Sequence, residues 1–162
     1  MNKIVIFGNS GSGKSTMALA LKQNYELAHL DLDTLAWEVE NPTVRRNMED
    51  SLKDLSEFIK TNDNWVIEGC YSSLLTEAIR HCTKLIFLNP GIDTCVQNCL
   101  ARPWESHKYP SPEAQHENLT MLLDWVKEYE TRDDEFSLQS HRQLFEEFAG
   151  EKIEYLSNQR SL

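Results

Sequence analysis

Short runs of consecutive apolar residues alternate with longer, helix-forming segments along most of the chain. The first run, residues 4–7, is apolar at every position and ends at Gly8, a pattern typical of a strand buried on both faces. Residues 14–25 are rich in helix formers. A strand, a glycine-rich turn and a helix in this order predict the first half of a βαβ unit.

The same alternation continues down the chain. Apolar runs predict further strands at 65–67 and 85–88, and residues 27–32 and 152–156 are further strand candidates. Helices are expected at 72–81 and 92–101. Thr43 is the expected N-cap of a long helix, because apolar residues recur every three or four positions behind it. This apolar stripe comprises Val44, Met48, Leu52, Leu55 and Ile59.

Residues 102–136 depart from this rhythm. Three prolines between residues 103 and 112 predict a loop, and two helices are expected after it. Strands alternating with helices imply an α/β fold with a parallel sheet covered on both faces, so we expect one domain over residues 1–162 with a helical insertion. The apolar positions of the two later helices are Leu119, Leu122, Leu123 and Val126, and then Leu138, Phe145 and Phe148.

The composition is that of a globular protein, with 40% hydrophobic and 26% charged residues. Sixteen Lys and Arg against 26 Asp and Glu leave a net charge of −10, which argues against direct binding of duplex nucleic acid or anionic lipid. The first apolar run is too short for a signal peptide or a membrane span, and the four cysteines are scattered, so we expect reduced thiols in a cytoplasmic protein. Cys95 and Cys99, with His107 nearby in sequence, lack a fourth ligand, so structural thiols are favoured over a metal site.

Residues 8–15 match the pattern G-x-x-x-x-G-K-[ST] at every fixed position. Such a loop wraps its backbone N–H groups around phosphates, its lysine reaches the β- and γ-phosphates, and its serine hydroxyl holds Mg²⁺. A glycine-rich turn with a surface lysine is the alternative, but the strand before it and the helix after it favour nucleotide binding. The expected phosphate-binding residues are Gly8, Asn9, Ser10, Gly11, Ser12, Gly13, Lys14, Ser15 and Thr16.

Two carboxylates follow the second expected strand. Asp31 and Asp33 come at its C-terminal end, the edge at which open parallel sheets bind ligands. Both side chains point to the same side of an extended chain, so one can hold Mg²⁺ and the other can accept the proton of an attacking hydroxyl. The alternative is a solvated strand end, with Asp33 capping the next helix.

Further candidates lie at the same edge of the sheet. Glu68-Gly69 closes the third strand, where a carboxylate can orient a Mg²⁺-bound water or an acceptor hydroxyl; an ordinary turn is the alternative. Arg45 and Arg46 open the long helix and can clamp an anionic acceptor, or else form a solvated helix face.

The 102–136 segment supplies the candidate lid cations. Phosphoryl transfer gains from a cation that closes over the γ-phosphate and excludes water. Arg102 and Arg132 are the expected residues, against the alternative of ordinary surface arginines.

Several of these segments resemble known kinases. Residues 4–16 resemble the start of adenylate-kinase-like small P-loop kinases. Residues 29–33 with Trp37, and residues 65–72, are similar to an adenylate-kinase-related group often labelled topology modulation proteins. Asp31-Leu32-Asp33 also resembles the Asp-x-Asp of shikimate kinases, and Arg102-Pro103 the start of their lid.

The resemblance implies a three-layer P-loop NTPase fold with five parallel strands in the order 2-3-1-4-5. It also implies an acceptor-binding region near residues 34–62, a mobile lid near 103–136, contact of Asp31 or Asp33 with Mg²⁺ and acceptor, and a lid arginine on phosphate. The chain departs from these families at Glu68, where adenylate kinases more usually have Asp, and in lacking the three-glycine acceptor loop of shikimate kinases.

We therefore expect an ATP-dependent kinase that phosphorylates a small molecule, with ATP and Mg²⁺ as cofactors. A hydroxyl acceptor is favoured over a nucleoside monophosphate, since a phosphate needs no base and the two aspartates would repel it. The alternatives are a nucleoside monophosphate kinase, a nucleotide-dependent regulator without an acceptor, and a structural protein with a vestigial phosphate loop. The catalytic assignments are Lys14, Asp33, Arg102 and Arg132; the acceptor contacts are Asp31, Asp33, Arg45, Arg46, Glu68 and Gly69; the metal contacts are Ser15 and Asp31.

Overall fold

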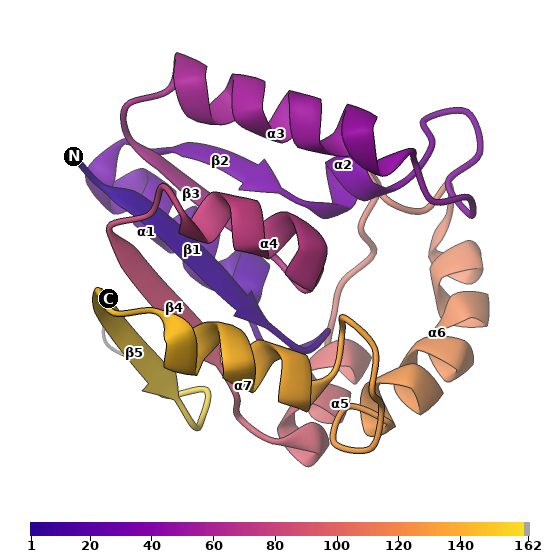
Figure 1. Ribbon diagram of the computed structural model, residues 1–162. Helices are drawn as coiled ribbons and strands as arrows, with labels where there is room; N and C mark the ends of the chain where they lie inside the picture. Colours follow the sequence, from indigo (N-terminus) through magenta and orange to yellow (C-terminus); the bar gives the residue numbers. More distant parts are fainter. Residues whose placement is uncertain (161–162) are drawn as a thin grey trace.

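The computed structural model describes residues 1–160, and residues 161 and 162 of the expected domain lie outside them. Its centre is one sheet of five parallel strands in the order β2-β3-β1-β4-β5 (Figure 1). The predicted α/β fold and the predicted strand order are confirmed. The strands are β1 (Lys3–Gly8), β2 (Ala28–Asp31), β3 (Trp65–Gly69), β4 (Lys84–Leu88) and β5 (Glu151–Tyr155).

Alternation along the strands gives the sheet two apolar faces. In β1, Val5 and Phe7 point to one face and Ile4 and Ile6 to the other, and all four are buried. Three helices cover the first face and α1 covers the second (Figure 1). Burial on both faces explains why the central strands are uninterrupted apolar runs. The helices on the first face are α3 (Met48–Thr61), α4 (Ser72–Ile79) and α7 (Leu138–Glu147), and the second carries α1 (Lys14–Tyr25).

Three further helices lie at the C-terminal edge of the sheet. The short helix α2 (Asp33–Ala36) follows β2 directly. Helix α5 (Ile92–Leu100) follows β4 and packs against α6 (Pro112–Lys127) around Cys95, Cys99 and Val126. Within residues 1–160, no helix is both long enough and apolar enough to span a bilayer.

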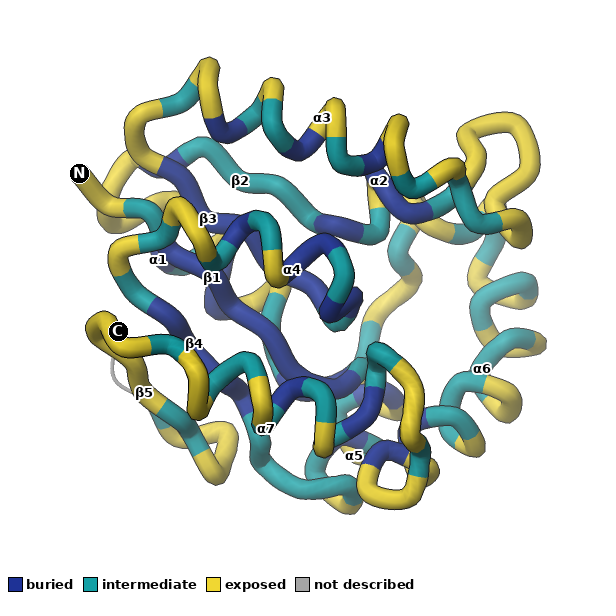
Figure 2. The backbone as a smooth tube through the Cα atoms, in the orientation of Figure 1, coloured by how far each residue is buried: buried dark blue, intermediate teal, exposed yellow. Residues whose placement is uncertain are grey.

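Residues 101–127 form an arch at this edge. The chain leaves α5 as an irregular loop, runs toward α2, and returns as α6 (Figure 1). Most of α6 is half-buried or exposed (Figure 2), and Val126 near its end is its one buried residue. The loop predicted at 103–112 is confirmed, except that Pro112 already begins α6. The arch therefore packs firmly only near the end of α6.

The long helix on the first face begins later than predicted. Helix α3 starts at Met48, and its N-cap is Asn47, whose side chain accepts a hydrogen bond from the Glu49 N–H at 2.8 Å. Thr43 is not the cap, and Val44 is 45% exposed in the preceding loop. The prediction was wrong because the true cap lies inside the stripe of apolar residues, where asparagine gives no break in the pattern.

A buried histidine joins α7 to the loops beside it. His141 is fully buried, with its Nε2 2.8 Å from the carbonyl oxygen of Cys70 and its Nδ1 2.7 Å from the hydroxyl of Tyr129. A carbonyl can only accept, so Nε2 carries the hydrogen and Nδ1 accepts from the tyrosine. Burial lowers the pKa of His141 to about 4, so the ring is neutral in the fold at neutral pH.

We expect His141 to make the fold acid-sensitive between about pH 6.5 and pH 4. In that window the unfolded chain binds a proton at this histidine and the folded chain does not, so the free energy of unfolding falls as the pH falls. The loss is about 3 kcal/mol. Urea unfolding at several pH values should show His141→Gln to be less stable at pH 7 but to lose less across the window. Equal losses in both proteins would contradict the assignment.

Candidate functional site

Residues 8–16, the phosphate loop, run from the end of β1 into α1 and leave the start of this helix open to an anion. Helix α1 begins after Gly13, which has a φ of 96°, and within residues 1–160 no side chain caps this helix. Its first turn contains no acidic residue. Free backbone N–H groups and the positive end of the helix dipole therefore face the loop, as a phosphate requires. A Cβ at residue 13 would lie 2.4 Å from the Nη1 of Arg160, whose Nη2 donates to the Ser12 carbonyl at 2.6 Å.

Helix α5 supports the same loop from the side. A Cβ at Gly11, which has a φ of 79°, would lie 2.4 Å from the carbonyl oxygen of Cys95 and 2.7 Å from the Sγ of Cys99. The Nδ2 of Asn98 donates to the Gly11 carbonyl at 2.8 Å. Burial raises the pKa of Cys95 to about 11, so this thiol packs as a small neutral group. Only glycine allows the loop to approach α5 this closely.

A buried carboxylate links α1 to the two neighbouring strands. Glu68 on β3 is 2% exposed and pairs in register with Asp31 on β2. Its Oε1 accepts a hydrogen bond from the Ser15 hydroxyl at 2.8 Å, and its Oε2 lies 3.1 Å from the Nε2 of His29. Glu68 and Gly69 are the last two residues of β3, as predicted, and the alternative of an ordinary turn is excluded.

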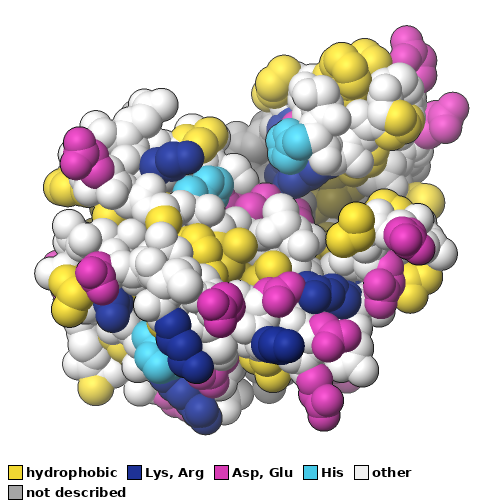
Figure 3. Space-filling view, turned by 90° about the horizontal axis from the view of Figure 1, so that it is seen from above, with side chains coloured by type: hydrophobic (Ala, Val, Ile, Leu, Met, Phe, Trp, Pro, Cys, Tyr) yellow, Lys and Arg dark blue, Asp and Glu magenta, His cyan; other side chains and the backbone are white. Residues whose placement is uncertain are grey.

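The two aspartates share a lysine from the arch. The Nζ of Lys108 lies 3.1 Å from the Oδ2 of Asp33 and 3.6 Å from the Oδ2 of Asp31, and 3.5 Å from Glu105. Asp33 begins α2, so the prediction that residues 31–33 form an extended chain is wrong, but both carboxylates still face one cation. Seen from above, the arch stands off from the body of the molecule, and acidic and basic side chains meet in the hollow between them (Figure 3).

The environments of these aspartates shift their pKa values in opposite directions. Burial, with the charges of Asp33 and Glu68, raises the pKa of Asp31. Burial also acts to raise the pKa of Asp33, but Lys108 and the Tyr71 hydroxyl outweigh it, so the net shift is downward. Asp33 is therefore the group held in the ionised form.

An aromatic wall, formed by Trp37, Tyr71 and Phe136, adjoins Asp33. The Tyr71 hydroxyl donates to Asp33 at 2.5 Å and accepts from the Nε1 of Trp37 at 2.9 Å. The guanidinium of Arg45 lies 5.0 Å from the Tyr71 ring centroid and 5.9 Å from that of Phe136. Such contacts orient an arginine without using its N–H groups.

The adjacent arginines have different surroundings. Both lie in the loop before α3, so the prediction that they open the helix is wrong. Arg46 pairs with Asp54 of α3 at 2.7 Å. Arg45 pairs more loosely with Glu135, at 3.7 Å, and its buried Nε has no hydrogen-bond partner among the described residues. Arg45 alone faces the wall beside Asp33.

The two predicted lid arginines also differ. Arg132 follows α6, stacks 4.0 Å from the Trp125 ring and donates to the Trp125 carbonyl at 2.9 Å. Its side chain is 8% exposed, and its Nη2 has no hydrogen-bond partner within residues 1–160. The next carbonyl, that of Val126, accepts from Asn9 of the phosphate loop, so Arg132 lies close to that loop. Arg102 pairs with Glu105 at 3.7 Å and remains partly exposed.

The donor set suits Mg²⁺. The Ser15 hydroxyl, Asp31 and Glu68 offer hard oxygen ligands at one edge of the sheet. Burial and, after it, the charges of Asp33 and Glu68 raise the pKa of Asp31, and a bound cation would relieve the second effect. Among residues 1–160 there is no group of three or more His, Cys, Asp or Glu side chains arranged to hold a metal ion alone. Mg²⁺ in nucleotide sites uses one or two protein oxygens together with substrate phosphates, so the residues fit.

Sequence reasoning missed several residues that complete this site. Lys108 is one of several cations in the arch, and the sequence around it does not indicate that it pairs with the two aspartates. Tyr71 reaches Asp33 only because β2 and β3 are adjacent, and His29 meets Glu68 for the same reason. Arg160 contacts the phosphate loop from 148 residues away in sequence.

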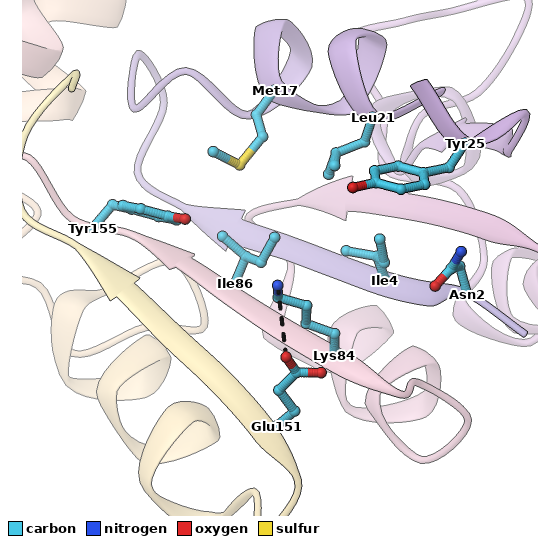
Figure 4. A pocket seen from close by; sticks show the side chains of 9 residues that line it. All are labelled: Asn2, Ile4, Met17, Leu21, Tyr25, Lys84, Ile86, Glu151 and Tyr155. Carbon is cyan, nitrogen blue, oxygen red and sulfur yellow. Dashed lines mark ion pairs between the residues drawn. The ribbon is translucent and has the colours of Figure 1, made fainter. Parts of the chain in front are cut away.

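A separate pocket of about 240 Å³ lies on the α1 face of the sheet (Figure 4). Its floor is apolar and includes Met17 and Leu21 of α1 and Ile86 of β4, while Lys84 and Glu151 form an ion pair at its rim, 3.8 Å apart. None of the residues that line it belongs to the phosphate loop or the carboxylate cluster. The candidate chemistry is at the C-terminal edge of the strands, outside this pocket.

We expect Lys108→Met to raise the pKa of Asp33, because an ammonium within hydrogen-bond reach favours the ionised carboxyl. NMR titration of the aspartate carboxyl carbons measures the change. Lys127→Met, an exposed lysine at the end of α6, is the control and should leave Asp33 unchanged. An unchanged Asp33 titration in Lys108→Met would contradict the ion pair.

Comparisons with solved structures identify kinases of the same fold. A sugar kinase from Janibacter sp. HTCC2649 matches 96% of this chain and 84% of its own, with 14% identity and a TM-score of 0.52. A gluconokinase from Sinorhizobium meliloti 1021 matches 98% of this chain and 84% of its own, with 16% identity and a TM-score of 0.53.

The uncharacterized protein YqaC of Bacillus subtilis (strain 168) is 23% identical over 129 residues, covering 78% of this chain and 72% of that protein. No model of a known protein family matches the chain. At these identities the solved structures establish the fold, which is that of P-loop kinases.

Proposed function

We propose that this protein is an ATP-dependent phosphotransferase of the adenylate-kinase-like P-loop group that phosphorylates a hydroxyl group of a small molecule. The observation that carries the proposal is the hydrogen bond between Ser15 of the phosphate loop and Glu68, because it joins an open helix N-terminus to a cluster of carboxylates. The similar sugar kinase and gluconokinase, named for substrates that carry hydroxyls, support a small-molecule acceptor by analogy of fold.

The phosphate loop binds the nucleotide in this proposal. The backbone N–H groups of residues 8–16 surround the phosphates, and Lys14 turns from the Asn9 carbonyl, which it now contacts at 2.7 Å, toward the β- and γ-phosphates. Ser15 and Asp31 would hold Mg²⁺, with Glu68 behind them. The ion neutralises charge on the transferring phosphoryl group when it is bound.

Asp33 acts as the general base. Its lowered pKa keeps it ionised at neutral pH, so it can accept the proton of an acceptor hydroxyl as the oxygen attacks the γ-phosphorus. Tyr71 holds the carboxylate in place by its hydrogen bond. Arg132, with its free Nη2 near the phosphate loop, and Arg102 at the start of the arch are the cations assigned to the transferring phosphate.

In this proposal the acceptor lies beside Asp33 and the aromatic wall, whose Tyr71 is hydrogen-bonded to Asp33. Residues 34–62 and Gly69 border this space, and the lid is the 103–136 segment. The unpartnered Nε of Arg45 supports an acceptor that carries an anionic group as well as its hydroxyl. The same observation keeps a nucleoside monophosphate as the second candidate acceptor.

Phosphorylation assays with ATP and Mg²⁺ across nucleosides, nucleoside monophosphates, sugars and hydroxy acids test the proposal. We expect turnover with a hydroxyl acceptor, loss of nucleotide binding or turnover in Lys14→Ala, and in Asp33→Asn a fall of about 10²- to 10⁴-fold in kcat with little change in ATP affinity. Turnover with monophosphates alone would overturn the hydroxyl acceptor, and an unchanged rate in Asp33→Asn would remove the base.

The neighbouring arginines provide a matched test of acceptor binding. We expect Arg45→Gln to raise the KM for an anionic acceptor by about tenfold or more, because a charged hydrogen bond is lost. Arg46→Gln should leave this KM within about twofold, since Arg46 is paired with Asp54. Steady-state kinetics with both variants measures this, and equal effects would contradict a specific role of Arg45.

A further inference from the structure

Glu68 is a carboxylate whose two oxygens are held from two different elements. Its side chain is 2% exposed, so few solvent contacts are available to it, and a buried carboxylate needs donors on its oxygens. Ser15 of α1 donates to Oε1 at 2.8 Å, and the Nε2 of His29 on β2 lies 3.1 Å from Oε2. Because a carboxylate can only accept, Nε2 of His29 carries the hydrogen in this contact.

We propose that His29 is a positioning residue for Mg²⁺ that acts through Glu68 on the Ser15 hydroxyl. The inference rests on the proposed function, in which Ser15 binds the metal. With Oε2 fixed by His29, the carboxylate presents Oε1 to the serine in one orientation. The Ser15 proton is then directed to Glu68, and the lone pairs of its oxygen are left for a cation.

The local geometry makes His29 more than a packing residue. Its side chain is 17% exposed and reaches into the site from the strand that also carries Asp31. In the register of the sheet, Asp31 lies opposite Glu68, so His29 lies two residues before the position that faces it. Most of the His29 side chain is therefore shielded from solvent, and its ring lies beside Glu68, which contacts Ser15 of the phosphate loop.

A second His–Glu contact in the same molecule provides the comparison. His81 lies 3.3 Å from Glu77, four residues away near the end of α4, with side chains that are 46% and 28% exposed. Solvent can replace that contact on either partner, and neither residue touches the phosphate loop. Removal of His81 should therefore have no effect on metal binding, whereas removal of His29 leaves Glu68 with one donor.

The test is calorimetric titration of the protein with a non-hydrolysable ATP analogue, with and without Mg²⁺. We expect His29→Leu to reduce the gain in affinity that Mg²⁺ provides by about 10- to 100-fold, the usual cost of losing a partner of a metal ligand. Affinity without Mg²⁺ should stay within about twofold. His29→Gln should restore most of the gain, because its amide N–H can reach Glu68 from nearly the same place, and His81→Leu should behave as the unmodified protein.

Stability is followed in parallel by thermal unfolding. His29→Asn retains a polar side chain but is too short to reach Glu68, so it serves as the defective variant if His29→Leu does not fold. A wild-type gain from Mg²⁺ in His29→Leu or His29→Asn would overturn the inference, as would a failure of His29→Gln to improve on them. If the unmodified protein bound no analogue at all, the proposed function itself would be wrong.

Discussion

The adjacency of parallel strands is the constraint on which the site depends. Because β2, β3 and β1 lie side by side and run in the same direction, their C-terminal ends meet at one edge of the sheet. The phosphate loop leaves β1 at that edge, Glu68 lies one residue before the end of β3, and Asp31 ends β2. Ser15 and His29 contact Glu68, and Lys108 pairs with Asp31 and Asp33. A change in strand order would separate these groups even if every local element remained intact.

The fold could be predicted from the chain because its strongest signals are local. Uninterrupted apolar runs marked the central strands, the two edge strands were found from mixed apolar and polar segments, and the sheet order followed from the resemblance of the phosphate loop and its neighbours to known kinases. The start of α3 could not be placed, since the cap Asn47 carries no sign that distinguishes it from other polar residues of the loop. The start of a helix depends on a single hydrogen bond between a capping side chain and a backbone N–H, and the spacing of apolar residues does not predict that bond.

The site was predictable only where a short motif contains the chemistry. The phosphate loop and the pair of aspartates are each short segments of sequence; the loop joins β1 to α1, Asp31 ends β2 and Asp33 begins α2. Tyr71 lies 38 residues from Asp33 in sequence, Lys108 lies 75 residues from Asp33, and Arg160 lies 148 residues from Ser12, so only the folded chain brings these side chains to the site. Arg45 and Arg46 are adjacent in sequence and carry the same charge, but Arg45 packs against an aromatic ring whereas Arg46 pairs with Asp54. The sequence does not distinguish these two environments.

Lys108 also affects the stability of the protein without bound ligands. An ammonium from the arch already lies within 3.6 Å of both aspartates and offsets part of their repulsion without a divalent ion. A chelator should therefore leave the native state intact, in contrast to proteins whose metal is part of the folding free energy. If the proposed function is right, the scaffold assembles first and the cation binds in a separate event.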